Sequence, residues 1–193
     1  MKERNKTKKI VTLGMLCALS VVLMMLIRFP IFPSAPFLEY EPMDIPLLIA
    51  GLHFGPLAGI AVVVISSLIQ AVTVSSGSGI IGAIMHIIQS GALILVASIV
   101  YNKNKTKKVA TLALILGTLS MALMAIPTNL IFTTRFMGAP VEVVKAMMLP
   151  TIIPFNLIKA GVNSIFAFFV YKPISNYLYK AEEPDPKVRE EQL

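Results

Sequence analysis

Long apolar segments separated by short polar stretches fill most of this sequence, and they restrict the chain to one class of fold. Of its 193 residues, 56% are hydrophobic and 14% are charged, whereas a soluble domain carries roughly 25% charged residues. Such a chain cannot cover a surface that faces water. Because a membrane span takes about 20 residues of helix, the sequence predicts an all-α integral membrane protein with six transmembrane helices.

Prolines and polar residues divide the apolar sequence into the six predicted spans. These spans cover residues 10–27, 44–53, 56–74, 80–101, 109–136 and 150–171. The second and third come from one apolar region of roughly 30 residues, which is too long for a single span. His53-Phe54-Gly55-Pro56 divides that region, because proline and the residue before it both disfavour a continuing helix. We expect a kink at Pro127, and the loop 137–149 has room for a short helix.

We predict one domain and a short tail. Residues 1–180 form a single six-helix transmembrane domain, and the charged, proline-containing residues 181–193 form a disordered cytoplasmic tail. The basic N-terminus leads into an apolar run without a small-residue cleavage site, so we interpret it as an uncleaved first span. Cys17 is the single cysteine, which excludes a disulfide framework within the chain.

The basic residues predict the orientation. Thirteen of the 17 Lys and Arg residues lie before the first span, between the fourth and fifth spans, or after the sixth. With six spans these three regions share one side, and the positive-inside rule makes both termini cytoplasmic. The net charge of +7 is therefore an orientation signal, and we expect the partner to be a lipid bilayer and not a nucleic acid.

The stretch between the first two spans carries an unusual polar cluster. Glu39, Tyr40, Glu41 and Asp44 stand close together, among prolines that each fix a backbone angle: Pro30, Pro33, Pro36, Pro42 and Pro46. A simple turn between two spans requires neither such a polar cluster nor so many prolines. The stretch therefore predicts a structured outer loop that covers a binding site, and the alternative is a stiff connector.

Three polar residues of the sixth span share one helical face. Asn156, Lys159 and Asn163 are spaced by three and four residues, and a lysine inside a span usually marks a functional interior site. Asn129 of the fifth span has a depth that matches Asn156. Two amides and an ammonium can bind a planar heterocycle with carbonyl acceptors and an N–H donor. We expect the ammonium to be an isolated buried charge in the empty protein; the alternative is a structural lysine bonded to a backbone carbonyl.

A glycine-rich segment precedes the fourth span. Residues 77–82 match G-x-G-x-x-G, but neither a strand nor the required acidic residue accompanies them, so this is not a dinucleotide site. Ser78, Gly79 and Gly82 would instead let a ligand approach the backbone at the start of a helix. His86, one turn further, is either a ligand-positioning donor or an ordinary buried histidine.

The sequence offers little for catalysis. It contains no P-loop, no H-E-x-x-H motif and no nucleophile with a base and an acid, so we expect a transporter subunit without its own ATPase site and not an enzyme. A channel should carry polar residues through the full membrane depth, whereas these gather in the outer half. In the first span, Gly14 and Ala18 lie one turn apart and favour close approach of another helix; packing inside the bundle is the alternative.

Four segments resemble the riboflavin-specific S components, the substrate-binding membrane subunits, of energy-coupling factor (ECF) vitamin transporters. They are FLEYEPMDIPLLIAGLHFGPLAG, SGSGIIGAIMHIIQSG, IPTNLIF and IIPFNLIKAGVNS, at residues 37–59, 76–91, 126–132 and 152–164. The resemblance covers nearly the whole chain except the tail. One difference is the pair Gly14 and Ala18, where the family has two alanines.

The resemblance implies high-affinity riboflavin binding near the outer face and uptake through an ATP-driven transporter in a prokaryotic plasma membrane. Asn129, Asn156 and Lys159 would hold the isoalloxazine ring, the glycine-rich segment would contact the ribityl chain, and the first loop would act as a gate. The first span would dock on a transmembrane coupling subunit that carries two ATPases. Riboflavin would be the transported substrate, and no cofactor or metal is implied. An S component for a different vitamin or heterocycle remains the alternative.

Overall fold

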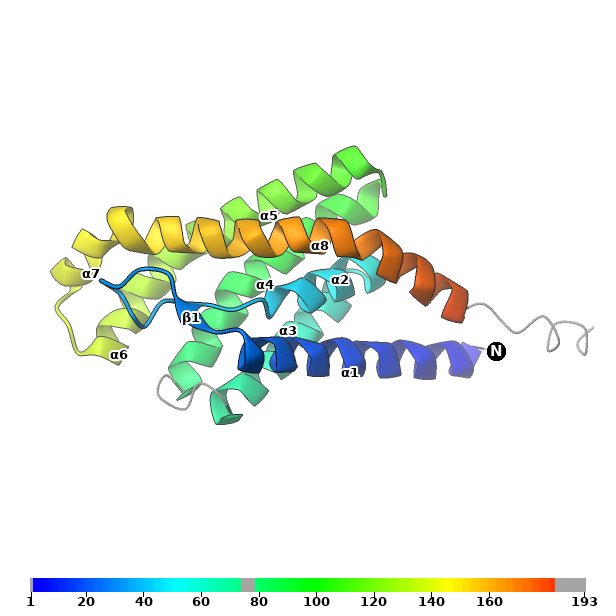
Figure 1. Ribbon diagram of the computed structural model, residues 1–193, viewed down its shortest axis with the longest axis horizontal. Coiled ribbons are helices and arrows are strands. Elements are labelled where there is room, and N and C mark those ends of the chain that lie inside the picture. Colours follow the sequence, from blue (N-terminus) through cyan, green and yellow to red (C-terminus); the bar gives the residue numbers. More distant parts are fainter. Residues whose placement is uncertain (1, 74–78, 183–193) are drawn as a thin grey trace, which may run out of the picture.

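The computed structural model describes residues 2–73 and 79–182, and Figure 1 shows a bundle of long helices with a short ribbon at one end. In chain order the elements are α1 (Lys2–Leu26), β1 (Phe29–Pro30), β2 (Glu39–Tyr40), α2 (Asp44–Phe54), α3 (Pro56–Thr73), α4 (Gly79–Lys103), α5 (Lys107–Thr128), the π-helix η1 (Asn129–Thr133), α6 (Thr134–Met137), α7 (Val141–Met147), the π-helix η2 (Met148–Ile152) and α8 (Ile153–Glu182).

Five described helical segments are long and apolar enough to cross a membrane, and α2 is a shorter apolar helix. The predicted division of the second apolar region is confirmed. Gly55 adopts a positive φ of 93°, which favours glycine, and Pro56 begins α3. At Gly59 a Cβ would lie 2.8 Å from the Cα of Gly51. Glycine therefore allows α2 and α3 to pack closely just beyond the turn.

The fifth and sixth spans differ from the prediction in their details. Pro127 lies inside α5, and the α-helix changes to the π-helix η1 two residues later; proline lacks the N–H that the regular hydrogen-bond pattern requires. The short helix expected in loop 137–149 is present as α7. We predicted an end near Tyr171, but α8 includes Pro173 and continues to Glu182, since a proline can bend a helix without ending it. Residues 183–193 of the predicted tail lie outside the described residues.

Helix α4 lies at the centre of the bundle. It packs against α2, α3 and α5, while α8 packs against α2 and α5, and α1 packs against α2 and α3. The main apolar core joins these helices and contains Met24, Leu48, Leu93 and Ile94 among its fully buried side chains. Most of the buried charged and amide side chains gather at the end where the ribbon lies, and His53 and Ser175 form a smaller buried polar contact near the other end.

The connection between α1 and α2 folds onto that end. Its strands β1 and β2 are antiparallel and pair Phe29 with Tyr40 and Pro30 with Glu39. Between them, Ala35 and Leu38 are buried in a second apolar cluster with Val144, Ile152 and Phe155. The segment 27–43, which we call the cover segment, is therefore anchored on α7, η2 and the start of α8.

Candidate functional site

A pocket lies between the cover segment and the bundle. Its empty space is about 760 Å³ including the open mouth. Charged, amide, hydroxyl and apolar side chains share the lining, which comprises Arg28, Phe37, Leu38, Glu39, Glu41, Gln70, Ile81, Gly82, Met85, His86, Gln89, Ser90, Met121, Asn129, Thr133, Phe155 and Lys159. The pocket thus combines apolar walls with several hydrogen-bonding groups.

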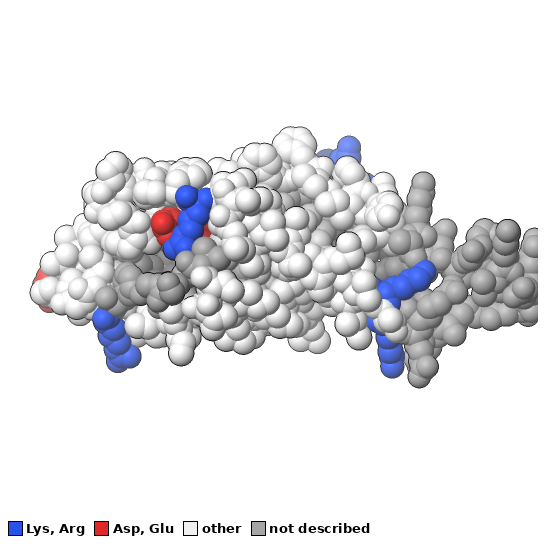
Figure 2. Space-filling view, turned by 60° about the horizontal axis from the view of Figure 1, so that its bottom comes forward, with Lys and Arg blue, Asp and Glu red and all other residues white. Residues whose placement is uncertain are grey.

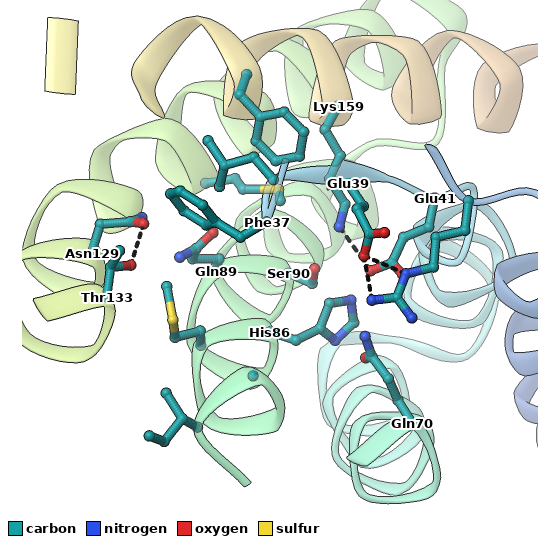
Figure 3. A pocket seen from close by; sticks show the side chains of 17 residues that line it. Phe37, Glu39, Glu41, Gln70, His86, Gln89, Ser90, Asn129, Thr133 and Lys159 are labelled. Atoms are coloured by element: carbon teal, nitrogen blue, oxygen red, sulfur yellow. Dashed lines mark hydrogen bonds and ion pairs between the residues drawn. The ribbon is translucent and has the colours of Figure 1, made fainter. Parts of the chain in front are cut away.

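Lys159 is not an isolated charge, which corrects the expectation from sequence. Its Nζ lies 2.9 Å from Oε1 of Glu41, and both side chains are buried. The pair joins α8 to the cover segment across the edge of the pocket (Figure 3). Because an ammonium has three donors, Lys159 can keep this ion pair and still donate to a ligand.

Beside this pair, Asn163 holds three parts of the site together. Its Nδ2 donates to the backbone oxygen of Glu41 at 3.1 Å and lies 3.3 Å from Oδ2 of Asp44. The Tyr40 hydroxyl donates to Oδ1 of Asn163 at 3.0 Å. Burial first and the Asp44 carboxylate second raise the pKa of the Tyr40 phenol, by more than Lys159 lowers it. The phenol therefore stays protonated and remains a donor at neutral pH.

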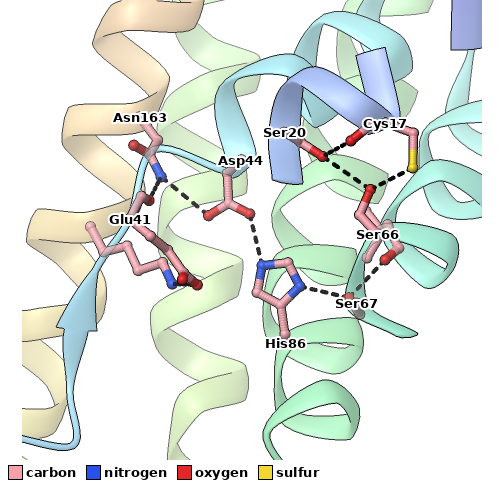
Figure 4. A network of polar contacts seen from close by, with 10 residues as sticks. Cys17, Ser20, Glu41, Asp44, Ser66, Ser67, His86 and Asn163 are labelled. Atoms are coloured by element: carbon pink, nitrogen blue, oxygen red, sulfur yellow. Dashed lines mark hydrogen bonds and ion pairs between the residues drawn. The ribbon is translucent and has the colours of Figure 1, made fainter. Parts of the chain in front are cut away.

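Asp44 connects this group to the central helix (Figure 4). Its Oδ1 lies 3.3 Å from Nε2 of His86, whose Nδ1 lies 2.7 Å from the Ser67 hydroxyl. That hydroxyl also donates to the backbone oxygen of Val63 at 2.7 Å. His86 is thus held at both nitrogens while one side of its ring faces the pocket.

The far side of the pocket is formed by α4, α5 and η1. The Asn129 amide donates to the backbone oxygen of Ala125 at 2.8 Å and accepts from Thr133 at 2.8 Å. Gln89 donates to Thr128 at 2.7 Å, which leaves its carbonyl oxygen available. Figure 3 shows Asn129 and Thr133 on one side of the pocket and Lys159 with Glu41 on the other.

The mouth carries a partly exposed ion pair. Arg28, just after α1, pairs with Glu39 of β2, and these side chains are 28% and 29% exposed. Figure 2 shows a compact group of acidic and basic atoms on one face, with largely uncharged surface between this group and the basic side chains at the right-hand end. Solvent can therefore reach the pocket beside the cover segment.

The predicted site residues fall into two groups. Glu39, Gly82, His86, Asn129 and Lys159 line the pocket. The remaining described ones do not line it: Tyr40, Asp44, Gly79, Asn156 and Asn163.

In that second group, Tyr40, Asp44 and Asn163 are buried and position the lining residues. Asn156 of α8 donates to the backbone oxygen of Ile152, the last residue of η2, and its buried Oδ1 has no hydrogen-bond partner among the described residues. Ser78 lies outside the described residues.

Sequence reasoning missed several lining residues. Gln89 follows Gly82 by seven residues and His86 by three, so the helical period places all three on one face. Gln70 is the single amide side chain of the apolar helix α3, and a lone polar group in such a helix also indicates an interior site. Glu41 was seen only as part of the polar cluster. Phe37 and Leu38 depend on how the cover segment folds, which no local pattern indicated.

The face of α1 that carries the small-residue pair is open. Gly14 and Ala18 are exposed, and a Cβ at Gly14 would meet no heavy atom within 4 Å. The alternative that this pair packs inside the bundle is therefore wrong. On the opposite face of α1, Ser20 and Cys17 contact Ser66 at 3.0 and 3.1 Å and attach the helix to α3.

Comparison with known proteins decides the family. The model of the substrate-specific component of ECF transporters matches residues 8–171. The chain belongs to this family. It is 32% identical to the riboflavin transporter FmnP of Bacillus subtilis over 86% of this chain and 91% of that protein. It is also 31% identical to the riboflavin transporter RibU of Staphylococcus aureus, over 90% of this chain and 94% of that protein.

A solved structure agrees with the fold of this S component. The structure of the S component of a bacterial ECF transporter matches with a TM-score of 0.76 and 30% identity, over 90% of this chain and 98% of that chain. The predicted family and the predicted class of membrane transport protein are confirmed. The family is a substrate-binding transporter component and not an enzyme.

Proposed function

We propose that this S component binds riboflavin in the pocket under the cover segment and serves its uptake as the substrate-specific subunit of an ECF transporter. The observation that carries the proposal is the lining of the pocket, where amides and one ammonium stand among apolar side chains. The relatives named riboflavin transporters, which match over 86% and 90% of this chain, support the choice of vitamin.

The chemistry of riboflavin suits such a lining. Its isoalloxazine ring is flat and largely apolar, and one edge carries two carbonyl oxygens and an N–H group. Met85, Met121 and Phe155 offer apolar and sulfur contacts to the ring faces. Gln89 and Asn129 supply amide groups that can donate or accept, and Lys159 supplies donors only. The ribityl hydroxyls would then lie nearer Gly82 and the mouth.

The cover segment would control access to the pocket. It contributes Glu41 to the ion pair with Lys159 and Glu39 to the partly exposed ion pair at the mouth. Arg28 and Glu39 both belong to the cover segment, so an opening that separates them breaks a partly exposed ion pair worth roughly 0–1 kcal/mol, together with the short β1–β2 pairing beside it. Lifting Glu41 would leave a buried charge unpaired, so we place the moving part near Arg28 and Glu39.

The remaining proposals concern orientation and partners. We propose that both termini are cytoplasmic, in a prokaryotic plasma membrane, with the pocket facing outside. The open face of α1 around Gly14 and Ala18 would dock on the transmembrane coupling subunit, and the two ATPases of the complex would supply the energy. Riboflavin is the cargo of this subunit and no cofactor is required.

Titration of riboflavin with the purified protein tests the binding. Flavin fluorescence should be quenched to saturation at one flavin per chain, and protein purified from riboflavin-containing medium should show flavin absorbance. Thiamine and biotin, added in excess, should not reverse the quenching, which separates riboflavin from other vitamins. Absence of saturable quenching by protein that has been freed of flavin would refute the proposed substrate.

Reporter fusions test the orientation. A reporter that works only in the cytoplasm should be active at the C-terminus and inactive when it is inserted in the loop 137–149. The reverse pattern would place the pocket on the cytoplasmic side and contradict the proposed orientation.

A further inference from the structure

The end of the bundle opposite the riboflavin pocket has a second hollow. It lies between the last turns of α4, the start of α5 and the later part of α8, and has an empty space of about 770 Å³ including its open side. Its lining includes Tyr101, Lys107, Leu114, Phe168, Tyr171 and Lys172. The floor is aromatic, because the Tyr101 and Tyr171 rings stack edge to face at 5.3 Å.

This hollow continues into an apolar groove. The groove runs between α5 and α8, has an empty space of about 980 Å³ with its open side, and shares Leu114, Phe168 and Phe169 with the hollow. Its further lining is almost entirely apolar and includes Ile115, Leu119 and Ile165. Together they form one channel along the bundle surface, polar at the basic end and apolar toward the middle. We call it the α5–α8 groove.

The polar end of the α5–α8 groove is positively charged. Lys107 and Lys172 come from different helices, line the same hollow and are exposed. Among the side chains that the structure describes, which exclude those of residues 2–5 and 179–182, no acidic group forms an ion pair with either ammonium. Lys107 is the first residue of α5, so the positive end of the helix dipole adds to the same potential. The hollow therefore favours an anion beside an apolar chain.

We propose that the α5–α8 groove binds an anionic phospholipid. The phosphate lies between Lys107 and Lys172, the glycerol backbone lies over Tyr101 and Tyr171, and one acyl chain follows the groove toward Leu119. Basic pockets between membrane helices bind anionic headgroups in this way, and tyrosines mark the interface level. With the orientation proposed above, the lipid belongs to the inner leaflet.

The proposed lipid would not compete with the docking of α1. Figure 1 shows α5 along one side of the bundle and α1 along the other. A coupling subunit seated on the open face of α1 leaves the α5–α8 groove facing the bilayer. The lipid can therefore stay bound in the free S component and in the complex.

The absence of tryptophan from the sequence makes a clean test possible. Phe168→Trp places a single reporter where the hollow and the groove meet. The full chain is reconstituted in equal mixtures of phosphatidylglycerol and phosphatidylcholine, in which one lipid or the other carries brominated chains that quench tryptophan. The composition is constant, so a difference in quenching reports which lipid occupies the groove. A parallel Phe169→Trp reporter, at a side chain that is 70% exposed, is used if Phe168→Trp does not fold.

We expect the reporter to show at least about fivefold preference for phosphatidylglycerol, since each lysine near a headgroup adds attraction. Lys107→Gln with Lys172→Gln should abolish the preference. The matched control, Lys103→Gln with Lys108→Gln, removes the same charge from the same end and should keep it, because neither residue lines the groove.

A second reporter separates a site from general accumulation of anionic lipid. Ile99→Trp is exposed to lipid and stands four residues before Lys103, as Phe168 stands four residues before Lys172. It should be quenched equally by both brominated lipids. Three results would each overturn the proposal. They are an equal preference at the two reporters, no preference at Phe168→Trp, and a preference that survives the loss of Lys107 and Lys172.

Discussion

Helices α1 and α8 are both long membrane helices, yet they use their polar residues in opposite ways. In α8, Asn156, Lys159 and Asn163 are buried, and two of them bond to the cover segment or α2. In α1 the buried polar contacts are short links to one neighbour, and the other face is open around Gly14 and Ala18. The contrast indicates that α8 organises the pocket, while α1 is attached to the bundle by one face and presents the other as a surface.

The largest effect on stability should follow from removing the ammonium of α8. In Lys159→Met the buried Glu41 carboxylate loses its ion-pair partner, and breaking a buried pair in this way costs roughly 3–5 kcal/mol. An isolated charge would have given an unchanged or raised stability, and the structure corrects that expectation. Thermal or denaturant unfolding of the purified protein measures the difference.

The control for this variant is Lys145→Met, which changes an exposed lysine of α7 and should leave stability within about 0.5 kcal/mol. A Lys159→Met protein as stable as the parent would mean that the pair with Glu41 does not exist in the membrane.

A smaller loss should follow at the junction between α2 and the pocket. Asp44→Asn keeps the shape but weakens the contacts to His86 and Asn163, and an imperfectly satisfied buried group costs roughly 1–3 kcal/mol. Riboflavin binding should weaken with it, because Asn163 positions the backbone at Glu41. Unfolding and flavin titration measure both effects.

The same substitution chemistry at an exposed position provides the control for Asp44→Asn. Glu142→Gln lies in α7, away from the pocket lining, and should change neither quantity. If Asp44→Asn also behaves like the parent, the polar group around Asn163 is not needed to shape the site.

How much of this contrast the sequence predicts depends on how far apart the contacting residues lie along the chain. Prolines and helical spacing located the span boundaries near Pro56 and the polar face of α8, because those signals are local. The partner of Lys159 stands 118 residues away in a loop, and no local pattern selects Glu41 over Glu39. Likewise, the spacing that put Asn156 on the polar face could not show that it bonds to the backbone four residues earlier.

The smallest effect on the isolated protein should come from the open face of α1. Gly14→Val and Ala18→Leu add bulk where the bundle has no contact, so stability and riboflavin binding should stay within about 0.5 kcal/mol of the parent. Assembly with the coupling subunit should weaken, because close helix approach is blocked. Co-purification with the coupling subunit and ATPases measures assembly. Variants that lose riboflavin but keep assembly would reverse the assignment of the two helices.

Riboflavin affinity without the buried ion pair tests the central claim most directly. Lys159→Met combined with Glu41→Met replaces the pair by apolar side chains, which usually preserves stability or improves it. Weaker binding can then not be attributed to unfolding. We predict at least about tenfold weaker binding in the fluorescence titration, a change of about 1.4 kcal/mol. A folded double variant that binds riboflavin as tightly as the parent would contradict the claim that the vitamin is held between α8 and the cover segment.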